Sequence, residues 1–204
     1  MVHLHGASGR GSDNLRQVSG SRMRGAALWT SDAVQQRYPS FVIVPQADPA
    51  YAPTWVDKWR APAKPDPARR EPLELVRLLI NELTRELPLD RERLYASGYS
   101  MGGFGVWIAV SRHPRLFAAA IPISGGGDPS DISDAETAVW AFHGGADNVV
   151  PPRRSRQMVE ALRGAGKAPR YTEYPGAGHE IQSRVYDETG IVDWIFSQRL
   201  PRQR

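Results

Sequence analysis

The sequence predicts an α/β fold in which a mostly parallel sheet has helices on both faces. Short apolar runs alternate with segments of helical periodicity along the chain, as expected where helices connect parallel strands. The runs are bounded by Gly, Pro or Asp, which is typical of strands buried on both faces. The chain has 204 residues, of which 41% are hydrophobic. This length suits one continuous core, so we expect residues 1–204 to form a single domain.

The same patterns place the elements along the chain. The apolar runs predict strands at residues 41–44, 94–97, 117–123, 139–142 and 171–174. A helix is predicted at residues 73–87, where apolar residues recur at three- and four-residue steps between Glu71-Pro72 and Pro88. Further helices are predicted at residues 100–113, near 158–164 and near 191–195. Residues 46–67 are rich in proline and aromatic residues and predict a loop within the domain.

Composition excludes several classes of function. The net charge of +4 comes from scattered basic residues, which argues against a nucleic-acid partner. The absence of cysteine excludes disulfides, thiolate metal sites and a cysteine nucleophile. The histidines are scattered without an acidic cluster, so we expect no metal site. No apolar stretch reaches the roughly 20 residues of a membrane span.

The start of the chain carries two expectations. The first residues lack the regions of a signal peptide, which predicts a cytoplasmic location for the chain as given. Val2-His3-Leu4 reads as the end of an apolar strand and is followed at once by a glycine-rich turn. We therefore also expect upstream sequence to be missing.

Ser100 is the predicted nucleophile. It lies in Gly98-Tyr99-Ser100-Met101-Gly102, between the strand predicted at 94–97 and a helix. A nucleophile elbow needs this context, because the serine occupies a strained turn and the glycines let strand and helix approach closely. The alternative is a glycine-rich packing turn with an incidental serine.

His179 is the predicted base that accepts the serine proton. It follows Gly176-Ala177-Gly178 after the last predicted strand, on a loop that can reach over Ser100. His143 is the alternative base, although its position at the end of an apolar strand favours a packed structural role. His113 ends the helix that starts at Ser100 and is expected to point away from it.

Asp147 is the predicted acid that orients the base. It follows the strand predicted at 139–142, and sites in open α/β sheets collect at the carboxyl ends of strands. Its alternative role is a turn or N-cap residue. Asp128 follows a different strand, and Asp187 and Glu188 come after the histidine, so these three are weaker candidates.

Acyl transfer also needs amide donors for the oxyanion that forms in the transition state. Met101, directly after the nucleophile, supplies the first predicted donor. The turn His5-Gly6-Ala7-Ser8-Gly9 supplies the second, with the Ala7 amide as candidate. The turn lacks the Lys-Ser/Thr of a P-loop and the spacing of a dinucleotide fingerprint, which argues against a phosphate cradle.

These motifs together resemble the α/β-hydrolases, and among them a group of predicted peptidases and carboxylesterases related to feruloyl esterases and polyhydroxyalkanoate depolymerases. The resemblance covers nearly the whole chain. It rests on residues 4–7, 41–46, 93–105, 121–127, 142–144 with Asp147, 174–175, and Gly178-His179. It implies an eight-stranded sheet, a Ser100–Asp147–His179 triad, no cofactor, and hydrolysis of small-molecule esters with short or aryl acyl groups.

The sequence departs from this group in two ways. The first two strands and any long lid insertion have no counterpart, so we expect an open site and an exposed edge at residues 41–44. Such an edge predicts a homodimer, or cover by the 46–67 loop. In that loop Trp55 and Trp59, with Gln46 at its start, are the expected substrate-binding residues; alternatively, both tryptophans cover the core.

The functional alternatives are a feruloyl- or polyester-type esterase and a peptidase. Peptidase action is less expected, because it usually depends on an additional domain that holds the peptide. The alternative from another class is a non-catalytic binding protein that has kept the fold.

Overall fold

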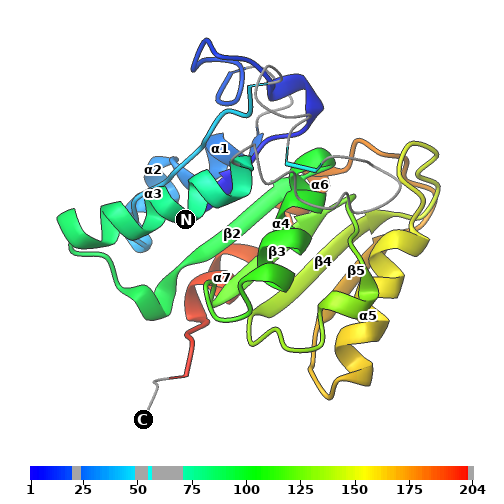
Figure 1. Cartoon of the computed structure of the whole chain (residues 1–204). Coiled ribbons are helices and arrows are strands. Elements are labelled where there is room, and N and C mark those ends of the chain that lie inside the picture. The colour runs from blue at the N-terminus through cyan, green and yellow to red at the C-terminus, as the bar shows by residue number, and fades with distance from the viewer. Residues whose placement is uncertain (20–23, 49–54, 57–70, 202–204) are drawn as a thin grey trace.

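A computed structural model of the chain describes residues 1–19, 24–48, 55–56 and 71–201. Parallel strands form one five-stranded sheet in the order β1-β2-β3-β4-β5, each hydrogen-bonded to the next (Figure 1). The strands are β1 (Val2–Leu4), β2 (Tyr95–Tyr99), β3 (Ala119–Ile123), β4 (Ala138–Gly144) and β5 (Arg170–Tyr174). Because every strand runs in the same direction, the residues that follow them meet at one edge of the sheet.

Helices cover both faces of the sheet (Figure 1). On one face the buried core includes side chains from α3 (Pro72–Glu86), α4 (Met101–Arg112) and α5 (Arg153–Gly164). On the other face it includes side chains from α1 (Arg24–Trp29), α2 (Asp32–Arg37), α6 (Gln182–Tyr186) and α7 (Ile191–Ser197). The short 3-10 turns are η1 (Ala7–Gly9), η2 (Arg91–Arg93) and η3 (Pro129–Asp131).

The strands alternate between these two cores. In β2, Ala96 packs in the first core, whereas Tyr95 and Tyr99 pack in the second. Both sides of the strand are therefore buried, as its apolar sequence requires. The parallel sheet with helices on both faces confirms the fold class predicted from sequence.

Residues 41–44 do not form the predicted strand. Only Ile43 pairs, in one parallel bridge with Val2, through the hydrogen bonds His3 N–H to Ile43 O (2.9 Å) and Ile43 N–H to Met1 O (2.8 Å). The partner strand β1 has only 3 residues, and Pro45 has no amide hydrogen to extend the ladder. Ile43 thus adds a single bridge beside β1 and no further strand. The described residues form five strands rather than the eight that the resemblance implied.

The sequence analysis did not predict α1, α2 and α6. These helices have 6, 6 and 5 residues, too few for a helical period to stand out in the sequence. α2 does carry a local signal, because the Ser31 side chain accepts a hydrogen bond from Val34 N–H and caps the helix.

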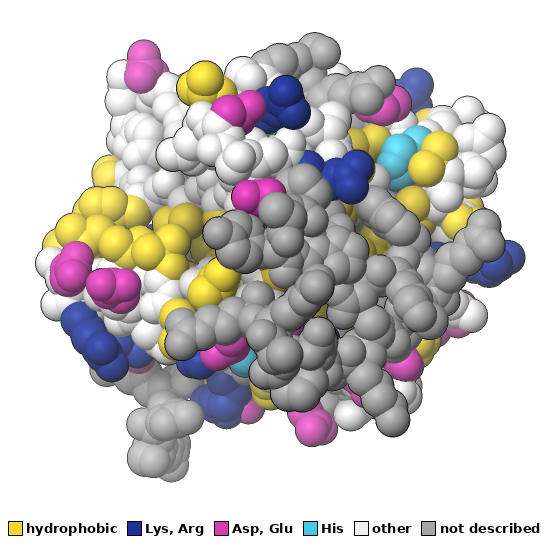
Figure 2. Space-filling model, turned by 45° about the horizontal axis from the view of Figure 1, so that its top comes forward, with side chains coloured by type: hydrophobic (Ala, Val, Ile, Leu, Met, Phe, Trp, Pro, Cys, Tyr) yellow, Lys and Arg dark blue, Asp and Glu magenta, His cyan; other side chains and the backbone are white. Residues whose placement is uncertain are grey.

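One apolar face of α3 is exposed. Leu73, Val76 and Ile80 are buried against the sheet. On the same helix Leu75, Leu78 and Leu79 are 44%, 39% and 37% exposed, and hydrophobic side chains gather in that region of the surface (Figure 2). Phe41, near the sheet edge, is also exposed. The homodimer stays a prediction that these surfaces do not test.

Two further features follow from the described ranges. None of their helices combines the length and hydrophobicity needed to cross a bilayer. No cluster of three or more His, Asp or Glu side chains within these ranges is arranged to hold a metal ion.

Candidate active site

Ser100 occupies a strained turn between β2 and α4. Its φ of 55° and ψ of −117° lie outside the regions that a residue with a Cβ ordinarily adopts. Its amide donates to Ile123 O at 2.8 Å, and its carbonyl accepts the first hydrogen bond of α4, from Phe104 N–H at 3.0 Å. At Gly102 a Cβ would overlap the carbonyl oxygen of Leu4. Glycine is therefore required for α4 to pack this closely against β1.

His179 reaches Ser100 from the loop that follows β5. Its carbonyl accepts hydrogen bonds from Tyr99 Oη and Ser124 Oγ, both at 3.3 Å. The Tyr99 ring also lies 5.1 Å from the imidazole, centroid to centroid. Ala146 N–H donates to Ala177 O at 2.9 Å and ties this loop to the one after β4. The sequence analysis did not identify these contacts of Tyr99 and Ser124 with His179.

Asp147 completes a hydrogen-bonded chain of three side chains. Its Oδ2 lies 2.7 Å from His179 Nδ1, and His179 Nε2 lies 2.9 Å from Ser100 Oγ. Asp147 Oδ1 accepts from the amides of Val149 and Val150 at 2.8 and 2.9 Å. The structure thus brings together the three side chains predicted from sequence.

These hydrogen bonds fix what the group can do. Because an ionised carboxylate only accepts, the His179 proton is assigned to Nδ1. His179 Nε2 is then free to accept the Ser100 hydroxyl proton. Ser100 is 8% exposed and Asp147 6% exposed, and a low-dielectric setting strengthens the interaction between the carboxylate and a protonated imidazole.

The two candidate oxyanion donors lie at the same edge of the sheet as Ser100. Met101 is the first residue of α4, whose first intrahelical hydrogen bond is donated by Phe104. The Met101 amide therefore has no intrahelical acceptor. Ala7 begins η1, three residues after the end of β1, and Leu4 at the end of β1 is paired with Gly98. The two candidate oxyanion donors thus come from neighbouring strand ends.

His5 and Trp55 hold the Ala7 turn in place. His5 Nδ1–H donates to Gly6 O at 2.7 Å, and His5 Nε2 accepts from Ala47 N–H at 3.0 Å. Burial lowers the pKa of His5, which favours this neutral form. The indole N–H of Trp55 donates to His5 O at 3.0 Å. The sequence analysis treated His5 only as part of a glycine-rich turn.

The predicted substrate-binding residues have different outcomes. Trp55 is 3% exposed and packs in the core, so its predicted place on a cleft wall is corrected to the core-covering alternative. Gly105 makes this possible, because a Cβ there would lie 2.9 Å from Trp55 Cβ. Gln46 Nε2 donates to Gly9 O at 3.1 Å and to Asp13 Oδ1 at 2.9 Å, and its substrate contact stays a prediction. Trp59 lies outside the described residues.

The alternative acids and His113 have other environments. Asp128 Oδ1 accepts from Ser130 N–H and Oγ, and these hydrogen bonds lower its pKa. Glu188 accepts from Tyr174 Oη, and Asp187 lies 3.6 Å from Arg24. His113 is the C-cap of α4, at the opposite end of that helix from Ser100.

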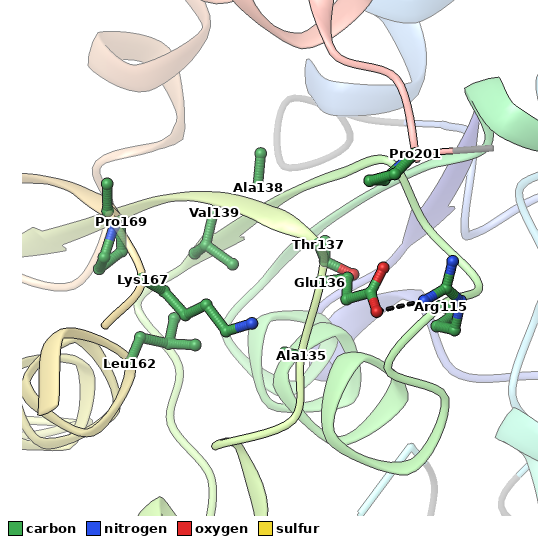
Figure 3. A pocket seen from close by; sticks show the side chains of 11 residues that line it. Arg115, Ala135, Glu136, Thr137, Ala138, Val139, Leu162, Lys167, Pro169 and Pro201 are labelled. Carbon is green, nitrogen blue, oxygen red and sulfur yellow. Dashed lines mark hydrogen bonds and ion pairs between the residues drawn. The ribbon is translucent and has the colours of Figure 1, made fainter. Parts of the chain in front are cut away.

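A separate hollow of about 870 Å³ lies at the amino ends of β4 and β5 (Figure 3). Its lining includes Val139, Lys167 and the ion pair between Arg115 and Glu136. Asp147 follows the other end of β4, so the 7 residues of that strand separate this hollow from the triad.

Comparison with protein families places most of these residues in a known group. Residues 68–189, more than half of the chain, match the dienelactone hydrolase family. The chain belongs to the dienelactone hydrolase family. This membership confirms the resemblance to the α/β-hydrolases.

Relatives by sequence and by structure agree with this placement. A thermostable esterase superimposes with a TM-score of 0.87 at 37% identity, over 97% of this chain and 54% of that chain. Acyl-protein thioesterase 1 of Gibberella zeae is 36% identical over 99 residues, 48% of this chain and 37% of that protein. Arabidopsis thaliana SOBER1, at 21% identity and a TM-score of 0.65 over 95% of both chains, shows the shared fold alone. This member of the dienelactone hydrolase family therefore spans about half or less of the length of the thermostable esterase and of acyl-protein thioesterase 1.

Proposed function

We propose that the chain is a serine hydrolase that cleaves carboxylic esters through an acyl-enzyme, with Ser100 as nucleophile, His179 as base and Asp147 as acid. The observation that supports this most is the hydrogen-bonded chain from Ser100 Oγ through the His179 ring to Asp147 Oδ2, at 2.9 and 2.7 Å. A non-catalytic binding protein that kept only the fold would not need this hydrogen-bonded chain.

The reaction begins when Ser100 Oγ attacks the ester carbonyl carbon and its proton passes to His179 Nε2. The carbonyl oxygen becomes an oxyanion, which the amides of Met101 and Ala7 stabilise. The carbon–oxygen bond to the alcohol then breaks, and His179 gives its proton to the leaving oxygen. Asp147 holds the imidazole in the required tautomer and stabilises its positive charge.

The second half of the reaction releases the acid. Water attacks the acyl carbonyl carbon while His179 Nε2 accepts a water proton, and the bond to Ser100 Oγ breaks. The proton returns from His179 to Ser100 Oγ, which restores the enzyme. Every proton therefore moves through one imidazole nitrogen, and these reaction steps need no metal or cofactor.

The proposed substrates are small esters with short or aryl acyl groups. The similarity to a thermostable esterase supports esters as substrates, and the short or aryl acyl group is the expectation from sequence. Thioesters are a second candidate class, because the chain is 36% identical to acyl-protein thioesterase 1 over 99 residues. Both classes pass through the same acyl-enzyme and differ only in the leaving atom.

The test is turnover of p-nitrophenyl esters of graded acyl length by the wild type and by Ser100→Ala. We expect the substitution to lower kcat by roughly a million-fold, because members of a triad act as a unit. Matched oxygen esters and thioesters in the same assay separate the two substrate classes. A Ser100→Ala variant that keeps more than a few per cent of the activity would overturn the assignment.

A further inference from the structure

His143 is a buried histidine that the proposed reaction does not use. It is the last residue but one of β4, and its side chain is 0% exposed. Desolvation is the largest influence on its pKa and lowers it, although Val150 O and the Asp147 carboxylate act in the opposite direction. The ring is therefore neutral, four residues before the proposed acid.

The hydrogen bonds of this ring assign its proton to Nε2. His143 Nε2 lies 2.9 Å from Val150 O and 3.3 Å from Asp147 Oδ2, and a carbonyl and an ionised carboxylate both only accept. His143 Nδ1 lies 2.7 Å from Ser155 Oγ and accepts its hydroxyl proton. Ser155 is buried in α5, and its hydroxyl also donates toward Gly125 O at 3.1 Å, so its one proton is shared between this carbonyl and the closer His143 Nδ1.

The Nε2–H group holds the Asp147 loop at two points. Val150 is fixed at both ends, because its amide donates to Asp147 Oδ1 at 2.9 Å and its carbonyl accepts from His143. Asp147 Oδ2, which accepts from His179 Nδ1 at 2.7 Å, also faces His143 Nε2. A rotation that took Oδ2 away from His179 would break these contacts together.

We propose that His143 is a positioning residue, which holds Asp147 in the orientation that His179 requires during acyl transfer. This inference rests on the proposed function. His143 does not touch the substrate and takes up no proton. It acts by presenting one N–H between Val150 O and Asp147 Oδ2, while Ser155 keeps the opposite nitrogen free of a proton.

The first test compares His143→Leu with His143→Gln. Leucine fills similar space but leaves Val150 O without its donor and removes the N–H that faces Asp147 Oδ2 beside His179. We expect kcat to fall about 10- to 100-fold, within the range for a buried acceptor that loses its donor, while KM changes little because no substrate contact is lost. Glutamine restores most of kcat, because a primary amide both donates and accepts, as the neutral imidazole does.

The second test asks whether His143 acts through Asp147. In the Asp147→Asn background, His143→Leu should lower kcat by no more than about threefold, because interacting residues give non-additive effects. His3→Leu is the matched control. His3 is also buried and hydrogen-bonded, to Ser97 Oγ at 2.9 Å, but it contacts no triad residue, so its kcat should equal the wild-type value.

Three results would overturn the inference: an unchanged kcat in His143→Leu, a lower kcat that glutamine does not restore, or an equal loss in the Asp147→Asn background. If His143→Leu does not fold, as judged by circular dichroism, Ser155→Ala decides in its place. It should lower kcat several-fold, and an unchanged kcat overturns the inference. Activity in Ser100→Ala would instead reject the proposed function, whatever the His143 variants show.

Discussion

The backbone strain at Ser100 predicts that the nucleophile position is stabilised by glycine. The φ of 55° and ψ of −117° at this residue cost about 1 to 3 kcal/mol for a residue that carries a Cβ. Glycine escapes most of this cost but loses about 0.5 to 1 kcal/mol because its unfolded chain is more flexible. We therefore expect Ser100→Gly to be more stable than Ser100→Ala by about 1 kcal/mol, with both variants inactive.

Thermal unfolding followed by circular dichroism measures this difference. For a domain of this size, about 1 kcal/mol corresponds to roughly 2–4 °C in Tm. Ser111, a helical residue in the last turn of α4, provides the control. There Ser111→Gly should melt below Ser111→Ala, because glycine in a helix costs up to about 1 kcal/mol relative to alanine. If Ser100→Gly melted at or below Ser100→Ala, the turn would not store strain and the reasoning would be refuted.

Three further predictions concern the acid, the helix contact and a buried histidine. Asp147→Asn should stay folded but lose about 10⁴-fold in kcat, because the imidazole loses its orienting acceptor; wild-type turnover of esters would exclude Asp147. Gly102→Ala should destabilise the fold by roughly 3 kcal/mol in urea unfolding, because its Cβ would overlap backbone atoms of β1. Burial lowers the pKa of His3 from 6.5 to about 3, so the unfolded state binds the extra proton and wild-type stability should fall by about 3 kcal/mol from pH 6.5 to pH 4. In His3→Gln the unfolding free energy should fall less over this pH range, by that amount. The same fall as in the wild type would show that His3 is not responsible.

The three triad side chains could be predicted from sequence because each lies in the segment that follows a strand. Ser100 follows β2, Asp147 follows β4 and His179 follows β5. In a parallel sheet those strand ends meet at one edge. Chain order and strand pattern were therefore enough to bring these residues together.

Trp55 could not be placed in the same way, because its burial depends on contacts between distant segments. A tryptophan in a proline-rich loop can cover a core or line a cleft, and the loop sequence is the same in both cases. The deciding partners are His5 O, which accepts its indole N–H, and the space left by Gly105. Glycine inside a helix is unfavourable by about 1 kcal/mol, so Gly105 was the one available signal of a close neighbour.

The roles of Tyr99 and Ser124 were also beyond the sequence, because both act on the His179 carbonyl from other strand ends. The strand predicted at 41–44 failed for a related reason. An apolar run becomes a strand only where a partner continues beside it, and β1 pairs with Ile43 alone in this segment.

The most direct test of the central claim is covalent trapping of the nucleophile. A fluorophosphonate reacts with an activated serine hydroxyl, forms a phosphorus–oxygen bond and releases fluoride. We expect intact mass spectrometry to show one label on the wild type, peptide mapping to place it on Ser100, and Ser100→Ala to remain unlabelled. An ester-hydrolysing enzyme that carried the label on another residue, or took up none, would contradict the assignment of Ser100 as the nucleophile.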